Sequence, residues 1–230
     1  MGSNRWRDSP YPDYRRDVDR SIDFSGLSVD FFLGGKAQHL QQLVSQRLAK
    51  PDLVGLDIGC GVGAMHPYLR RTFTRVYGVD VSADAIREAA QRNPWADYAA
   101  YDGSTLPFEA ASMDVVFASC VLHHVSPASW SHFMHEAKRV LRPRGVFVVF
   151  EHNPYNPLTR LAVWRCKFDE DAVLLTRRST EALFKGAGFG DVVGHYIFFL
   201  PIAASWARRA EAWLHALPLG AQYYVAGIRT

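Results

Sequence analysis

Residues 53–63, LVGLDIGCGVG, join a short apolar run to three closely spaced glycines, Gly59, Gly61 and Gly63. The apolar run is typical of a buried β-strand, and glycines allow positive φ and a close approach of a ligand to the backbone. A helix that begins directly after such a turn offers unpaired N–H groups to an anionic group. We therefore predict a strand, a turn and a helix that together bind a nucleotide-like ligand.

Short apolar segments alternate with stretches of helical periodicity along the rest of the chain. We predict strands at 53–58, 75–79, 98–101, 115–119, 146–150, 191–200 and 222–229, and helices at 36–48, 65–73, 82–91, 130–141, 180–185 and 205–216. This alternation predicts an α/β fold. Its doubly wound, mostly parallel sheet would carry helices on both faces and bind ligands beyond the carboxyl ends of the strands.

Two parts of the chain do not follow the simple alternation. Residues 1–35 have no clear period but are too apolar for a disordered tail, so we expect a cap over the strand ends. We expect residues 36–230 to form one domain, with residues 152–178 inserted on the substrate side after the fifth strand.

Composition and charge limit the kinds of partner and the cellular compartment that we expect for this chain. The net charge is only +3, and the arginines near the start are interleaved with aspartates, so we expect no nucleic-acid partner. No apolar run is long enough to span a membrane. Three scattered cysteines and the lack of a charged-then-apolar leader favour the cytoplasm. The aromatic residues near both ends suit a hydrophobic substrate pocket, the core or a homodimer interface, and the sequence leaves these three open.

Three aspartates lie at the carboxyl ends of predicted strands, and one of them, Asp57, discriminates between ligands. Asp57, two residues before the first glycine, would repel the pyrophosphate of a dinucleotide but attract the α-ammonium group of S-adenosylmethionine. Asp80 stands where a carboxylate can bind a ribose diol, and Asp102 with Gly103 offers an acceptor and a backbone donor to an adenine edge. Each aspartate also has a purely structural interpretation, as a turn or N-cap residue.

Four motifs follow one another along the chain: DIGCGVG at 57–63, GVDVS at 78–82, YDG at 101–103 and SMDVVFASCVLHHV at 112–125. In order and spacing they resemble those of the class I S-adenosylmethionine-dependent methyltransferases, over roughly residues 36–190. The resemblance implies a seven-stranded sheet of order 3-2-1-4-5-7-6 with the last strand antiparallel. It also implies S-adenosylmethionine as cofactor, bound by Asp57, Gly59, Gly61, Gly63, Asp80, Val81, Asp102, Gly103 and Ser119.

Candidate catalytic residues follow the fourth and fifth strands. His123 and His124 come after the fourth and Glu151 ends the fifth, so in neighbouring strands they would face one pocket. An imidazole there could take a proton from the acceptor, with Glu151 holding it. The histidine pair has an alternative role, which is to fix the loop. We expect no metal, because ligands beyond His123, His124, Glu151 and His152 are not evident, and we interpret the acidic triplet 169–171 as a solvated face.

The predicted function is S-adenosylmethionine-dependent methyl transfer to a small organic acceptor of natural-product, aromatic or lipid-like type. Such a transfer is an in-line displacement in which alignment alone can supply roughly 7–11 kcal/mol. The alternatives are a non-methylating enzyme on the same fold, such as a cyclase, a nicotinamide-dependent oxidoreductase, and a binding protein without activity.

Overall fold

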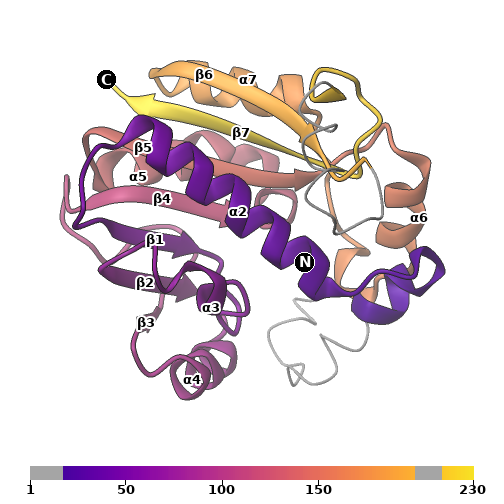
Figure 1. Cartoon of the computed structure of the whole chain (residues 1–230), viewed down its shortest axis with the longest axis horizontal. Helices are drawn as coiled ribbons and strands as arrows, with labels where there is room; N and C mark the ends of the chain where they lie inside the picture. Colours follow the sequence, from indigo (N-terminus) through magenta and orange to yellow (C-terminus); the bar gives the residue numbers. More distant parts are fainter. Residues whose placement is uncertain (1–17, 200–213) are drawn as a thin grey trace.

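The computed structural model describes residues 18–199 and 214–230. Its strands form one sheet of order β3-β2-β1-β4-β5-β7-β6 (Figure 1). They are β1 (Val54–Ile58), β2 (Arg75–Asp80), β3 (Asp97–Ala100), β4 (Met113–Ser119), β5 (Leu141–His152), β6 (Phe189–Ile197) and β7 (Gln222–Arg229). β7 runs antiparallel to both of its neighbours, and the other pairs are parallel. The predicted fold class and strand order are confirmed.

Helices cover both faces of this sheet, as predicted. They are α2 (Val29–Arg47), α3 (His66–Leu69), α4 (Ala83–Arg92), α5 (Trp130–Val140), α6 (Pro157–Arg165) and α7 (Arg177–Gly186), with short 3-10 turns η2 (Asp23–Ser25), η3 (Leu122–His124), η4 (Pro127–Ser129) and η5 (Lys167–Asp169). In the central strands Val115 and Phe117 of β4 join the core cluster under α2 and α3, whereas Val116 and Ala118 join the one under α5 and α7. This period of two fixes the register of the buried strands.

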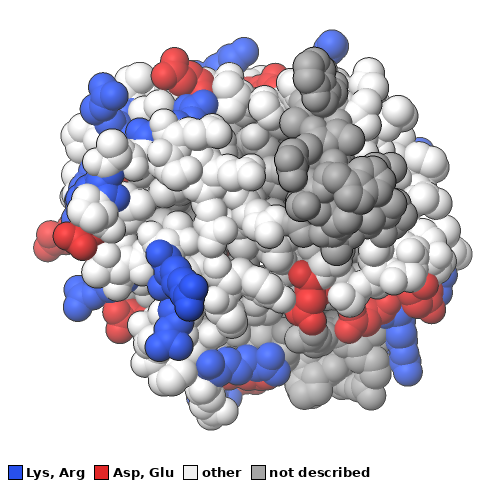
Figure 2. All heavy atoms as spheres, viewed as in Figure 1, with Lys and Arg blue, Asp and Glu red and all other residues white. Residues whose placement is uncertain are grey.

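The helix before β1 is longer than predicted. It begins at Val29 rather than at residue 36, and so it crosses the boundary at residue 35 that we drew between cap and domain. Gly34 and Gly35 concealed the helical period, and Gly35 is needed because a side chain there would meet the ring of Phe198. Figure 1 shows α2 lying across the sheet. Residues 1–17 of the predicted cap and most of the predicted helix 205–216 lie outside the described residues (Figure 2).

Two asparagines tie the segment after β5 to the segment before β7. The buried side chain of Asn153 donates to the carbonyls of Pro218 and Gly220. Asn156 caps α6 through Leu158 and donates to the carbonyl of Leu219. The second Asn-Pro step, which we expected to hold a loop, therefore starts a helix, as proline at the first helical position allows. None of the described helices is long and apolar enough to cross a membrane.

Candidate active site

The three glycines after β1 all have left-handed φ, at 73° for Gly59, 53° for Gly61 and 65° for Gly63. Their surroundings differ. A Cβ on Gly59 would lie 2.5 Å from Val121, and one on Gly63 would lie 2.5 Å from the hydroxyl of Tyr98, so these two glycines allow close packing. A Cβ on Gly61 would meet nothing within 4 Å. Gly61 is therefore the position where a ligand can lie against the backbone.

The carboxylate of Asp80 holds this loop from the end of β2. Its Oδ2 accepts the Gly61 N–H at 2.8 Å, and its Oδ1 accepts the Ser82 N–H at 2.9 Å. Burial is the main cause that raises the pKa of Asp80, and the backbone hydrogen bonds oppose it. Asp80 thus has a structural role, while its carboxylate remains at the carboxyl end of β2 where a ribose would lie.

Asp57 is buried at the base of the loop, and its surroundings indicate most directly which cofactor fits the site. Its Oδ2 lies 3.0 Å from Nε2 of His66, whose Nδ1 lies 2.5 Å from the hydroxyl of Tyr98. Its Oδ1 is buried and has no hydrogen-bond partner among the described residues. Burial, partly offset by His66, raises the pKa of Asp57. An unpaired buried acceptor fits an ammonium group such as that of S-adenosylmethionine, because the ligand would satisfy it.

The residues predicted to contact adenine lie after β2 and β3. Gly103 has φ 81°, and a Cβ there would lie 3.1 Å from Cγ1 of Val81, so the two residues are neighbours. Asp102 is exposed, and its Oδ1 accepts the N–H groups of Ser104 and Thr105. These bonds lower its pKa. Asp102 thus has the structural role of a turn residue, which was one of its two interpretations. Its contact with adenine stays a prediction.

A buried lysine that the sequence analysis did not single out lies beside Ser119. Lys36 of α2 donates to the hydroxyl of Ser119 at 3.0 Å and lies 3.1 Å from the sulfur of Cys120. Burial opposes ionisation of the Cys120 thiol, but Lys36 and His152 together bring its pKa to about 6. The sequence offered little signal, since Lys36 is simply the first residue of the helix predicted at 36–48.

The structure brings His123 and Glu151 together, as predicted for neighbouring strands. Nδ1 of His123 lies 2.5 Å from Oε2 of Glu151, and Oε1 accepts the Leu122 N–H at 2.8 Å. Both side chains are about 1% exposed. Although burial opposes both charges, their mutual attraction lowers the pKa of Glu151 and raises that of His123. Such a pairing fixes the orientation of the imidazole.

His124 and Asp169 complete the group around His123. Oδ1 of Asp169 lies 3.5 Å from Nε2 of His123 and 3.4 Å from Nε2 of His124. Asp169 is only 12% exposed, so assigning it to a solvated face was wrong, whereas Glu170 and Asp171 are exposed as expected. Despite burial, the neighbouring histidines lower its pKa to about 2. Burial and the charge of His123 lower the pKa of His124 to about 4.

Comparison with known proteins gives a consistent result. Residues 56–149 match the family model described as "Methyltransferase domain". An uncharacterized methyltransferase of Synechocystis sp. is 32% identical over 166 residues, which are 70% of this chain and 78% of that protein.

Two further relatives match over about half of this chain and less than half of their own length. A probable phthiotriol/phenolphthiotriol dimycocerosates methyltransferase of Mycobacterium ulcerans is 33% identical over 53% of this chain and 48% of that protein. A fatty-acid O-methyltransferase of Mycolicibacterium smegmatis is 32% identical over 49% and 43%.

A solved structure from Thermotoga maritima, titled a SAM-dependent methyltransferase and possible histamine N-methyltransferase, superposes with a TM-score of 0.63. It is 18% identical and covers 94% of this chain and 99% of that one, which supports the fold alone. The glycine loop, the sheet order and the coverage of the Synechocystis protein lead to one conclusion: this chain belongs to the class I S-adenosylmethionine-dependent methyltransferases and is an enzyme.

Proposed function

We propose that the chain transfers the methyl group of S-adenosylmethionine to a small, largely apolar organic acceptor of the natural-product or lipid-like class. The observation that carries this proposal is the buried Oδ1 of Asp57, unpaired among the described residues, beside the open backbone of Gly61. When bound, the cofactor supplies an electrophilic methyl group. Asp57 would hold its ammonium group, Asp80 and Val81 its ribose and adenine, and Gly103 the adenine edge.

The apolar character of the acceptor is supported by the segment after β5. Helix α6 lies beyond the carboxyl end of β5 and exposes Leu158, Leu161 and Trp164, the last at 80%. Two mycobacterial relatives are named as methyltransferases of phthiotriol/phenolphthiotriol dimycocerosates and of a fatty acid, which supports an acceptor of the lipid-like class.

The two histidines would have separate roles in removing the proton of the acceptor. His124 is 28% exposed whereas His123 is 1% exposed, so an acceptor can reach His124 more easily. We assign proton acceptance to His124. His123 and Glu151, buried and paired at 2.5 Å, would be positioning residues that fix the loop carrying His124.

Calorimetric titration with S-adenosylmethionine and S-adenosylhomocysteine tests the cofactor part. We expect micromolar binding of both, lost in Asp57→Ala and kept in Asp84→Ala, because Asp84 is an exposed aspartate of α4 that pairs only with Arg87 in the described contacts. Absence of binding in protein shown by circular dichroism to be folded would refute the proposal. An acceptor screen by mass spectrometry, with His124→Ala as the inactive reference, then tests the transfer itself.

A further inference from the structure

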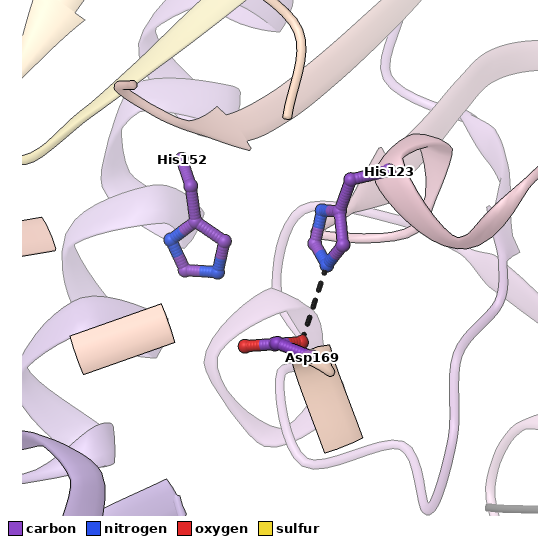
Figure 3. A group of neighbouring side chains, drawn as sticks. All are labelled: His123, His152 and Asp169. Carbon is purple, nitrogen blue, oxygen red and sulfur yellow. Dashed lines mark ion pairs between the residues drawn. The ribbon is translucent and has the colours of Figure 1, made fainter. Parts of the chain in front are cut away.

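Three side chains from separate segments converge next to the proposed acceptor site. His123 comes from η3, His152 ends β5 and Asp169 ends η5. One donor atom of each lies within 4.8 Å of the others, and Figure 3 shows the two rings and the carboxylate facing a common point. The expectation that no metal is bound rested on the lack of convergent ligands, and Asp169 supplies the one that was missing.

The spacing suits an ion better than direct hydrogen bonds. Charge-assisted N–H···O bonds are about 2.7–2.9 Å long. Nε2 of His123 lies 3.5 Å from Oδ1 of Asp169. Two ligand atoms bound to one tetrahedral zinc ion at about 2.0–2.1 Å are separated by roughly 3.3 Å, which follows from the tetrahedral angle. Because all three donor atoms lie within 4.8 Å of one another, shifts of roughly 1.5 Å or less would bring each pair to the separation that a single ion requires.

The groups behind the ligands also have the arrangement found around bound metals. A ligating histidine usually has its second ring nitrogen paired with a carboxylate or carbonyl oxygen, which fixes the tautomer. Glu151 does this for His123 at 2.5 Å. For His152, the side-chain amide of Gln222 lies 3.5 Å from Nδ1, and the buried Oε1 of this amide has no partner among the described residues. Exchange of the amide oxygen and nitrogen, which have nearly the same shape, would let Gln222 accept from Nδ1.

The cluster is also connected to the cofactor loop. Cys120, which contacts Lys36 at 3.1 Å, follows Ser119 at the end of β4 and interacts with His152. Lys36 in turn lies close enough to Asp57 to affect its pKa. An acceptor held at the cluster would therefore lie on the same edge of the sheet as the methyl donor.

From these observations we infer that His123, His152 and Asp169 form a binding site for a divalent transition-metal ion that holds an oxygen of the acceptor. Two imidazoles and one carboxylate suit zinc and similar first-row ions, and three protein ligands leave coordination positions open. The acceptor O–H bond would break with its proton passing to His124. The oxygen electron pair would then form the bond to the methyl carbon, while the electrons of the carbon–sulfur bond remain on sulfur. This role of the ion rests on the proposed methyl transfer, but binding of the ion does not.

The test is titration of Zn²⁺ into the full chain without a histidine tag, after treatment with EDTA and without cofactor or acceptor. We expect one tightly bound ion per chain. Glu151→Gln should weaken the binding about 10–100-fold, as loss of an outer partner does, and Asp169→Asn should weaken it further. The matched control is His132→Ala combined with His135→Ala, since these exposed histidines of α5 lie outside the cluster and should leave binding unchanged.

Circular dichroism and S-adenosylmethionine titration of the same samples separate the two proposals. Unchanged cofactor binding with zinc binding lost in Asp169→Asn supports the site. Zinc binding that persists in folded Asp169→Asn, or that disappears in the α5 control, overturns it. Wild-type protein that binds S-adenosylmethionine but no zinc also overturns the metal site and leaves the proposed function intact.

Discussion

The carboxylate of Asp80 binds the backbone N–H of Gly61 across the gap between β2 and the glycine loop, at 2.8 Å. A residue predicted to contact the ribose thus also shapes the loop for the methionine part of the cofactor. Asp80→Ala should therefore weaken cofactor binding through both routes, with a loss of at least about 10-fold in affinity, given that a hydrogen bond to a charged group contributes about 1.5–3 kcal/mol. Titration of S-adenosylhomocysteine checks this, with Asp84→Ala as control. Affinity within twofold of the wild type would contradict it.

Alanine at Gly59 and at Gly61 should have different effects. Both residues have positive φ, which costs an L-residue roughly 1–2 kcal/mol. Gly59→Ala adds a clash with Val121, so it should reduce the free energy of unfolding more than Gly61→Ala does. Gly61→Ala should mainly reduce cofactor affinity, since its Cβ projects into open space. Urea unfolding and calorimetry measure the two effects, and equal loss of stability in both variants would contradict this assignment.

Removal of the His66 side chain should strongly destabilise the fold. His66 and Asp57 are buried and 3.0 Å apart, and leaving one buried polar partner without its hydrogen bond costs about 1–3 kcal/mol, to which the cavity left by the ring adds. Tyr98→Phe is the matched milder change, because it removes only the hydroxyl that contacts Nδ1 of His66. We expect it to cost about 1 kcal/mol. Chemical denaturation of His66→Ala and Tyr98→Phe checks the ranking, and a reversed order would refute it.

Asp114 should give the fold a stabilising term that depends on pH. Although burial opposes its ionisation, hydrogen bonds from Val54, Lys50 and Arg142 lower its pKa below the ordinary value. A lowered folded pKa means that this stabilisation is present at neutral pH and is lost as the pH falls through about 4 and below. Asp114→Asn should cost about 2 kcal/mol at pH 7. Urea unfolding at pH 7 and pH 3 should show a smaller difference from the wild type at the lower pH.

The sequence predicted the fold and the glycine loop because both depend on local patterns. Glycines at alternate positions after an apolar strand leave few alternatives, and the period of two in β4 separates its two faces. The pairing of His123 with Glu151 could also be predicted, because the strand order brings the ends of β4 and β5 together.

Contacts that depend on the path of loops could not be predicted in this way. Asp169 belongs to a charged triplet that looks solvated, and only the turn after α6 brings it to His123. His123 and His124 both approach Asp169 because they lie in the 3-10 turn η3. Lys36 reaches Ser119 because α2 packs across the sheet.

The position of β7 between β5 and β6 affects how the chain can fold. Among the described strands β6 pairs with β7 alone, although β7 follows it in the sequence. During synthesis, β5 and β6 must therefore each keep an open edge until residues 222–229 have emerged. Exposed strand edges can pair with other chains. The interval before β7 is inserted is thus the stage at which this chain is most vulnerable to aggregation.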